Sequence, residues 1–330
     1  MALTLTGRSV EAGAYSNRTD PAQKRFQYTQ LHMGVQARIV LYAVDEARAE
    51  AACAAAFRRI AELDGIFSDY RPDSEAMRLC DRAGGPPVAV GRDLFRVLEY
   101  SVRFSARCEG AFDVTVGPIV RLWREARRTG VLPSPAALAE ARARVGWDKV
   151  ELDPAAHTVR LATPGMRLDF GGIAKGYADD CALEALRRHG IRSALIEFGG
   201  DIAVSDPPPG AKGWIVEIPA APGAPGRRLT VRNCAISTSG DTEQYVEIGG
   251  KRYSHIVDPR TGMGLTDRIA VTIVGPNGLT TEGLSKAVSV LGDRRGSELV
   301  RQYPGVRAFI RHLGAPGPRP PSTAAPGDGR

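Results

Sequence analysis

The sequence has no cysteine pattern that would support a disulfide framework or a zinc site. It contains five cysteines, Cys53, Cys80, Cys108, Cys181 and Cys234, which lie far apart and form no C-x-x-C pair. Disulfide-rich domains and structural zinc sites need closely spaced cysteines, usually in even numbers. We therefore expect neither kind of cross-link in this chain.

The chain also has no hydrophobic run long enough to cross a membrane. No segment approaches the roughly 18 apolar residues of a membrane helix. The N-terminus carries neither the apolar core of a signal peptide nor a lipobox cysteine behind one. As written, the sequence predicts a cytoplasmic protein without a membrane segment.

The sequence lacks nucleic-acid-binding signatures although it is basic. Its formal net charge is +7 and its pI is about 9.3. The arginines are spread through helical stretches such as 121–144, and neither aromatic RNP-like runs nor Cys/His zinc spacings occur. We expect a solvated basic surface and no nucleic-acid partner. The alternative, a polyanion binder, predicts steeply salt-dependent retention on heparin.

The composition is that of a globular protein, with 43% hydrophobic and 25% charged residues. Residues 1–25 are polar without a period, and 314–330 are rich in Pro and Gly, so we expect both ends to be disordered. Between them, helical and strand-like patterns alternate and predict an α+β fold. Strands are expected at 35–43, 269–274 and 306–311, helices at 45–63, 92–108, 134–146, 174–189, 282–291 and 294–303, and an antiparallel meander across 194–257.

Five glycine-containing or turn-rich stretches fall outside these elements. Each alone is weak evidence for a site, because Gly-Gly and Asp-Pro are common in turns. Five in one chain indicate a function. They are GAFDVTVGP (110–118), LDFGGIAKG (168–176), EFGGDIAVS (197–205), STSGDTEQY (237–245) and SHIVDPRTG (254–262).

The stretch LDFGGIAKG combines features that suit an anionic ligand with one that does not. Gly171 and Gly172 allow close approach of a ligand, and the helix that follows aims free N–H groups at it. Lys175 is positively charged and suits a phosphate, whereas the negative charge of Asp169 would repel one. A ligand with both a donor-rich end and an anionic end would suit both residues. The spacing matches neither a Walker loop nor G-x-G-x-x-G.

Taken in order, these stretches resemble the ApbE family of flavin transferases. The family's M-G-T appears as Met33-Gly34-Val35, its F-S-x-Y as FSDY (67–70) and its Ser-Glu pair as Ser74-Glu75. Its other motifs appear as GAFDVTV, DFGGIAKG, GGDI (199–202), TSGD (238–241) and HIVDPRTG (255–262). The resemblance covers about 28–311. It implies an ApbE-like (T-fold-like) α+β domain at 26–313, with mixed and antiparallel sheets flanked by helices and two intertwined halves.

The resemblance implies an activity at the pyrophosphate of FAD. FMN would pass from FAD to a threonine hydroxyl of an acceptor protein, AMP would leave, and Mg²⁺ would assist. Such a reaction needs positioning, charge neutralisation and a base. The residues that the resemblance places against FAD are Met33, Tyr70, Ala111, Phe112, Asp113, Asp169, Lys175 and Ile256. Many family members are periplasmic lipoproteins.

His255 is the candidate general base, because imidazole titrates near neutral pH and can accept a hydroxyl proton. Asp258 would either orient this imidazole or cap the DPRTG turn. These two roles remain open on the sequence alone.

The chain departs from the family at the metal motif. The family's A-D-A-x-x-T aligns with 281–286, so that Glu282 replaces Asp and Lys286 replaces Thr. In one interpretation Gly172, Glu282 and Ser285 still hold a weaker Mg²⁺; in another, the Lys286 ammonium replaces its charge. An ammonium cannot ligate Mg²⁺. A third possibility is that the alignment slips by one turn. The alternative function is an FAD-binding protein with little or no transfer.

Overall fold

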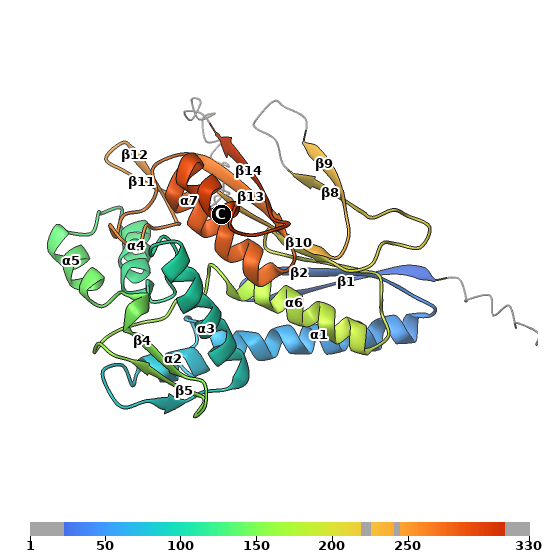
Figure 1. Cartoon of the computed structure of the whole chain (residues 1–330), viewed down its shortest axis with the longest axis horizontal. Coiled ribbons are helices and arrows are strands. Elements are labelled where there is room, and N and C mark those ends of the chain that lie inside the picture. Colours follow the sequence, from blue (N-terminus) through green and yellow to red (C-terminus); the bar gives the residue numbers. More distant parts are fainter. Residues whose placement is uncertain (1–22, 219–225, 241–244, 314–330) are drawn as a thin grey trace, which may run out of the picture.

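The structure is a computed structural model and describes residues 23–218, 226–240 and 245–313. Its centre is a seven-stranded sheet in which every neighbouring pair is antiparallel. Both halves of the chain contribute strands, as expected for two intertwined halves (Figure 1). In spatial order the strands are β1 (Lys24–His32), β2 (Val35–Ala43), β6 (Ala194–Phe198), β7 (Asp201–Val204), β10 (Cys234–Gly240), β13 (Ile269–Gly275) and β14 (Arg307–His312).

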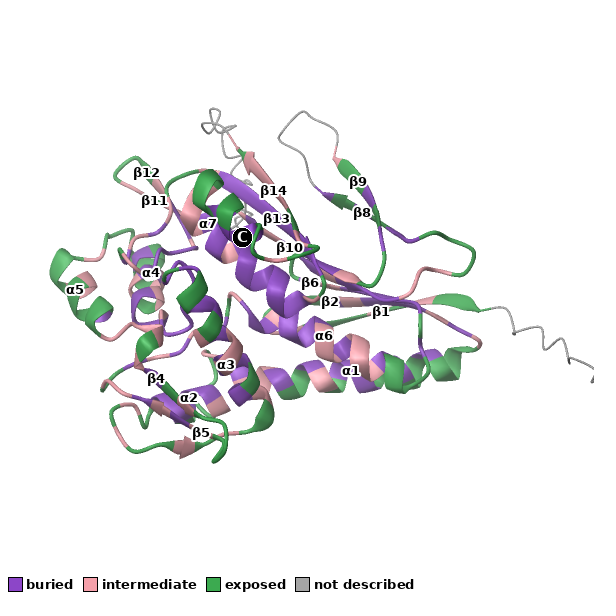
Figure 2. Ribbon diagram, viewed as in Figure 1, coloured by how far each residue is buried: buried purple, intermediate pink, exposed green. Residues whose placement is uncertain are grey.

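Three long helices cover one face of this sheet: α1 (Glu46–Phe67), α6 (Ala174–Arg188) and α7 (Gly278–Val300). Helix α1 begins at the N-cap Asp45, whose carboxylate accepts a hydrogen bond from the Arg48 amide at 2.8 Å. Small residues on its inner face, such as Ala52 and Ala56, allow α6 to pack closely against it. The main hydrophobic core lies between these helices and the sheet, where Figure 2 shows the ribbons mostly buried.

The other face of the sheet is covered by a separate hairpin of β8 (Trp214–Ile218) and β9 (Arg227–Val231). Alternate residues of β8 are buried, and Trp214 and Val216 pack with Val40 and Val204 in a second apolar cluster. The central strands of the sheet are therefore buried on both faces, whereas the edge strand β1 is largely exposed.

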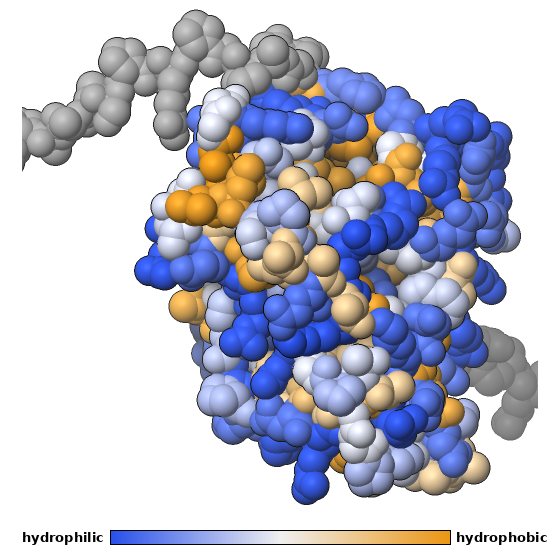
Figure 3. All heavy atoms as spheres, turned by 90° about the vertical axis from the view of Figure 1, so that its left-hand side faces the viewer, coloured by the Kyte–Doolittle hydropathy of each residue, from blue (hydrophilic) through white to orange (hydrophobic). Residues whose placement is uncertain are grey.

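The remaining elements form a lobe at one end of the sheet, on the left in Figure 1. A third apolar cluster there joins Trp123 and Ala141 to Tyr253 and Val257. Hydrophilic side chains cover much of this face in Figure 3, and apolar ones gather in small groups. The elements are α2 (Glu75–Cys80), β3 (Val88–Ala89), α3 (Arg92–Arg107), α4 (Gly117–Thr129), α5 (Pro135–Ala143), a short 3-10 helix (Trp147–Lys149), β4 (Val150–Asp153), β5 (Thr158–Leu161), β11 (Tyr245–Ile248) and β12 (Lys251–Ser254).

The α+β prediction is confirmed, but the expected meander across 194–257 is wrong. Strands β6, β7 and β10 join the large sheet, whereas β8–β9 and β11–β12 form separate hairpins. The single strand expected at 229–238 is divided at Asn233, whose φ of 46° turns the chain. The two late helices run together as α7, interrupted at Gly292.

Three further predictions concern the ends, the cysteines and the membrane. Strand β1 starts at Lys24, slightly before the expected domain start, while 1–22 and 314–330 lie outside the described residues. All five cysteines are free in the structure. Within the described residues, none of the helices combines the length and apolarity that a membrane crossing needs.

Candidate functional site

The glycine-rich stretches meet at the N-terminus of α6. The Asp169 amide donates to the Val114 carbonyl at 2.7 Å, which ties LDFGGIAKG to GAFDVTVGP. A Cβ on Gly172 would stand 3.4 Å from the Phe112 ring, so the turn lies directly beside that ring. Two stretches separated by some fifty residues therefore share one surface.

The third and fourth stretches, EFGGDIAVS and STSGDTEQY, join the same cluster through neighbouring strands. The Thr238 amide donates to the Gly200 carbonyl at 3.4 Å. The Lys175 side chain lies against Gly199, where a Cβ would stand 3.4 Å from its Cδ, and Val35 packs there as well. Residues 241–244 of the fourth stretch lie outside the described residues.

Helix α4 fixes the fifth stretch, SHIVDPRTG, to the first. Its Trp123 indole donates to the Gly262 carbonyl at 2.8 Å. Gly110, at the start of the first stretch, lies beside the Arg260 side chain, with a Cβ position 3.8 Å from its Cγ. All five stretches are thus connected by direct contacts.

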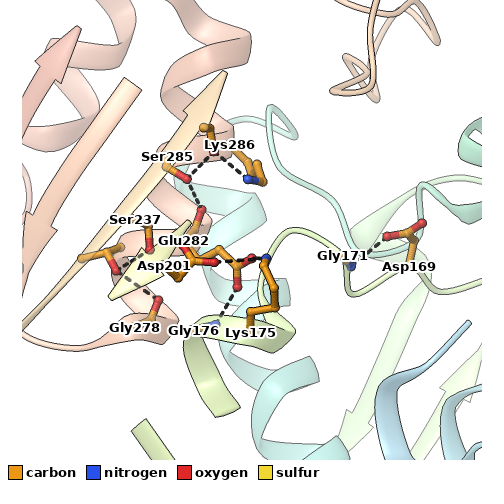
Figure 4. A network of polar contacts seen from close by, with 12 residues as sticks. Asp169, Gly171, Lys175, Gly176, Asp201, Ser237, Gly278, Glu282, Ser285 and Lys286 are labelled. Atoms are coloured by element: carbon orange, nitrogen blue, oxygen red, sulfur yellow. Dashed lines mark hydrogen bonds and ion pairs between the residues drawn. The ribbon is translucent and has the colours of Figure 1, made fainter. Parts of the chain in front are cut away.

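An ion-pair network occupies the centre of this cluster (Figure 4). The Lys175 ammonium pairs with Asp201 at 3.1 Å and, more closely, with Glu282. The second Glu282 oxygen accepts from the Gly176 amide at 2.8 Å. Burial alone would lower the pKa of Lys175, but the two carboxylates raise it, so the ammonium stays charged. Burial raises the pKa of Glu282, and Lys175 opposes that rise.

A close crossing of α6 and α7 builds this network. A Cβ on Gly176 would stand 2.2 Å from the Gly278 carbonyl oxygen, so only glycine permits this approach. The Asp180 carboxylate bonds the Gly278 and Leu279 amides at 2.7 and 3.0 Å, which holds the first turn of α7 against α6.

The second lysine of the network, Lys286, lies on α7 beside the Gly171–Gly172 turn. Its ammonium donates to the Ser239 hydroxyl at 2.6 Å. Ser239 also contacts the Ser285 hydroxyl at 2.7 Å, and Ser285 donates to the Glu282 carbonyl at 2.8 Å. Burial and the charge of Lys175 lower the pKa of Lys286.

These residues do not fit a magnesium ion. Both Glu282 carboxylate oxygens are engaged, by Lys175 and by the Gly176 amide, and an ammonium stands at Lys286. The Lys286 side chain also fills the space beside Gly172, whose Cβ would stand 3.1 Å from its Cγ. Mg²⁺ requires oxygen ligands in near-octahedral geometry. Nor do His, Cys, Asp or Glu side chains gather in threes as a metal site anywhere in the described part of the chain.

Asp113 is turned inward. Its carboxylate accepts from the Thr115 amide at 2.8 Å, the Thr115 hydroxyl at 2.7 Å and the Trp147 amide at 2.9 Å. Burial raises its pKa, and these bonds oppose the rise. Asp113 therefore shapes the turn that carries Ala111 and Phe112, both of which are buried. Its predicted contact with FAD stays a prediction.

Asp169 lies on the opposite side of the Gly171–Gly172 turn from Lys175 (Figure 4). It accepts from the Gly171 amide at 2.9 Å and pairs with Arg124 of α4 at 3.2 Å. Burial and the nearby Asp69 carboxylate raise its pKa, while Arg124 opposes them. Arg124 also pairs with Asp69 and lies under the ring of Tyr70, which is 77% exposed.

The other predicted contacts lie at the edges of the cluster. Met33 occupies the turn between β1 and β2 with a φ of 46°, next to Val35 and hence to Gly199. His255 and Ile256 follow β12, where His255 is half-buried and Ile256 is buried. Asp258 accepts from the Arg260 amide and guanidinium at 2.9 Å, which favours the turn-capping role over the orienting one.

Two surface hollows lie outside the centre of this cluster, and the second is lined in part by Asp258 and Thr261 of the fifth stretch. One, of about 350 Å³, is lined by residues near Arg232 and Arg307 at the far end of the sheet. The other, of about 210 Å³, lies between the loop 258–267 and the Gly292 kink of α7. Neither is lined by a residue that we expected against FAD. The contacts among the five stretches therefore define the site better than either hollow does.

Three residues of the site were not expected from the sequence: Asp201, Ser239 and Arg124. Asp201 and Ser239 lie inside the third and fourth stretches, so their position was a usable signal. Arg124 lies on a helix rich in exposed arginines, and nothing in its spacing distinguishes it from them.

Comparison with known proteins agrees with this arrangement. The model of the ApbE family matches residues 33–310. The FAD:protein FMN transferase of Treponema pallidum is 34% identical over 305 residues, 87% of this chain and 84% of that protein. That of Haemophilus influenzae is 32% identical, covering 73% and 72% of the two chains.

Solved structures give the same result. The flavin transferase ApbE of Vibrio cholerae superimposes with a TM-score of 0.79 at 28% identity, over 87% of this chain and 93% of that one. The ApbE protein of Thermotoga maritima gives 0.77 at 26% identity, over 88% and 97%. Because the family model matches residues 33–310 and the solved structures cover 87–88% of the chain, this chain belongs to the ApbE family.

Proposed function

We propose that this chain is an FAD:protein FMN transferase. The observation that supports the proposal most is the set of direct contacts that joins all five stretches around the N-terminus of α6 and the buried Lys175 network. The relatives from Treponema pallidum and Haemophilus influenzae named above are FAD:protein FMN transferases. An anionic substrate suits a glycine-rich turn at a helix N-terminus.

In the proposed reaction, the hydroxyl oxygen of an acceptor threonine forms a bond to the FMN phosphorus of FAD. The P–O bond to the AMP half breaks, and AMP leaves with the bridging oxygen and its electron pair. The hydroxyl proton passes to the imidazole of His255. FAD is the donor substrate and is consumed, and its FMN half ends as a phosphoester of the acceptor threonine.

The position of each residue in the site indicates its role in binding FAD. The exposed Tyr70 offers a ring face to a planar part of FAD, whereas the buried Phe112 ring supports the Gly171–Gly172 turn from behind. Asp169 would accept from donor groups of the ligand, and the turn at Gly171–Gly172 would receive its anionic part. Lys175 pairs with Asp201 and Glu282, and the pair with Glu282 fixes the position of that turn relative to α7.

The test is incubation of the purified full chain with FAD and an acceptor domain that carries a flavinylation threonine. Fluorescent flavin on the acceptor in a denaturing gel, lost in His255→Ala, would support the proposal. Tight FAD binding without labelled acceptor would refute transferase activity.

A second function follows from the altered metal motif. If Glu282 and Lys286 abolish catalysis, the chain is an FAD-binding protein that holds the dinucleotide without passing FMN on. Bound FAD, absence of AMP release and an unlabelled acceptor would together favour this alternative.

A further inference from the structure

We propose that the Lys286 ammonium takes the place of a divalent cation at the FAD pyrophosphate, so that this chain binds FAD without Mg²⁺. The inference rests on the proposed function, because it concerns the same ligand at the same turn. It follows from the failure of the site to fit a metal.

The first observation is that Lys286 retains donors for a ligand. An ammonium has three hydrogens. The Ser239 hydroxyl, at 2.6 Å, is the partner that Lys286 has within the described residues, and no carboxylate lies within ion-pair distance of it there. Lys175, in contrast, is held by both Asp201 and Glu282. Of the two lysines, Lys286 is therefore the one that can bond an anion without breaking an ion pair.

The second observation is the position of Lys286. Its Cγ and Cε would lie 3.1 and 3.8 Å from a Cβ on Gly172, so its side chain runs along the turn that opens α6. Helix α6 has fifteen residues and no side-chain cap at its N-terminus. A partial positive charge and an ammonium therefore stand at the same turn, which favours an anion between them.

The third observation is the charge already present. The network contains two ammonium groups and the two carboxylates of Asp201 and Glu282, and of the two ammonium groups only Lys175 is paired with these carboxylates. A divalent cation added here would meet Lys286 and would compete with Lys175 for Glu282. A pyrophosphate would instead gain an ammonium partner. Lysine supplies one charge where Mg²⁺ supplies two, but it requires no octahedral set of oxygens.

The experiment is an FAD titration of the EDTA-treated full chain, followed by flavin fluorescence, in excess EDTA and again in millimolar Mg²⁺. Binding of Mn²⁺ to the same sample is followed by electron paramagnetic resonance. We expect equal FAD affinity in both buffers and no stoichiometric Mn²⁺ binding. FAD binding that requires Mg²⁺, or one tightly bound Mn²⁺ per chain, would overturn the inference and leave the proposed function standing. Failure to bind FAD in either buffer would overturn both.

Variants test the residue itself. Lys286→Met removes the charge at similar length, and we expect FAD affinity to fall ~10- to 100-fold, the value of one charge-assisted hydrogen bond. Lys212→Met, on an exposed loop before β8, is the matched control and should bind FAD as the parent does. Unchanged affinity in Lys286→Met would overturn the inference. Lys286→Thr with Glu282→Asp should gain Mn²⁺ binding; the titration of the parent chain decides the matter even if this variant does not fold.

Discussion

The guanidinium of Arg124 lies 4.4 Å from the centre of the Tyr70 ring. The same group pairs with Asp69 and, at 3.2 Å, with Asp169. One side chain of α4 therefore holds both the FSDY turn and the turn that opens α6. The neighbouring Trp123 holds the DPRTG loop through Gly262. Two consecutive residues of α4 thus position the FSDY turn and two of the five stretches on which the proposed function depends.

Removing this guanidinium should weaken FAD binding. In Arg124→Met, Asp169 would lose its cation and Tyr70 its support, and we expect FAD affinity to fall ~10-fold with a loss of about 1–3 kcal/mol in the free energy of unfolding. Fluorescence titration and urea denaturation measure the two quantities. Arg128→Met is the control, because Arg128 is exposed and pairs only with Glu125 of its own helix among the described residues. Equal effects of the two substitutions would show that Arg124 has no special role.

Substitution at the crossing of α6 and α7 should destabilise the protein strongly. The Cβ of Gly176→Ala would meet the Gly278 carbonyl at 2.2 Å, a backbone contact that cannot rotate away. We expect a loss of about 3 kcal/mol or more in the free energy of unfolding, since overpacking forces the two helices apart.

The control for this crossing is Gly65→Ala in α1, where nothing lies within 4 Å of the new Cβ. That change should stabilise the protein by about 0.5–1 kcal/mol, because alanine favours helix more than glycine does. A Gly176→Ala variant as stable as the parent would contradict the close crossing.

Substitution of two adjacent aspartates of α6 by alanine should change the free energy of unfolding in opposite directions. Asp179 is buried and neither of its carboxyl oxygens has a hydrogen-bond partner within the described residues, whereas Asp180 caps α7 through two amides. At neutral pH we expect Asp179→Ala to stabilise the protein by about 1–2 kcal/mol. Asp180→Ala should destabilise it by about 1 kcal/mol. Urea denaturation of both variants measures the difference.

The gain from Asp179→Ala should depend on pH. Burial, with the nearby Asp201, raises the pKa of Asp179 well above its usual value, so the folded state holds this proton more tightly than the unfolded state does. The stability of the parent therefore falls as pH rises above the unfolded pKa of about 4. The advantage of the variant should be smallest near pH 4 and should grow toward pH 7. An advantage that shrinks as pH rises would contradict this account.

Substitution of the candidate base should separate transfer from binding. We expect His255→Ala to lower the rate of FMN transfer ~10²- to 10⁴-fold, the usual contribution of a general base. FAD affinity should stay close to that of the parent. His312→Ala, at an exposed position of β14 where the imidazole pairs with Asp293, should transfer FMN as the parent does. A parallel loss of affinity and transfer in His255→Ala would assign the residue to binding instead.

Local signals in the sequence predicted several of the helices and strands. Which strands pair with one another depends on contacts between segments far apart in the sequence, and this was not predictable. The helix at 174–189 was predictable from its glycine start and Gly190 stop, and strand β2 from its apolar run. The separate β8–β9 hairpin was not, because its alternating pattern is the same as that of a strand in the large sheet. The polar strand β1 and the short α2 carried no clear pattern of either kind.

In the site, too, the sequence indicated which residues matter, and the structure was needed to show their contacts. Lys175 and Glu282 were both expected to matter, but their ion pair joins residues 107 positions apart, and no spacing rule reveals it. The substitution at Lys286 was visible in the sequence. That its ammonium bonds Ser239 and lies beside Gly172 required the three-dimensional structure.

The measurement that tests the central claim most directly is the stoichiometry of flavin transfer. The full chain, FAD and a threonine-bearing acceptor domain are incubated, and AMP is quantified by chromatography while the acceptor is weighed by mass spectrometry. The account predicts one AMP released for each FMN attached to the acceptor. FAD that remains intact beside an acceptor of unchanged mass would contradict it.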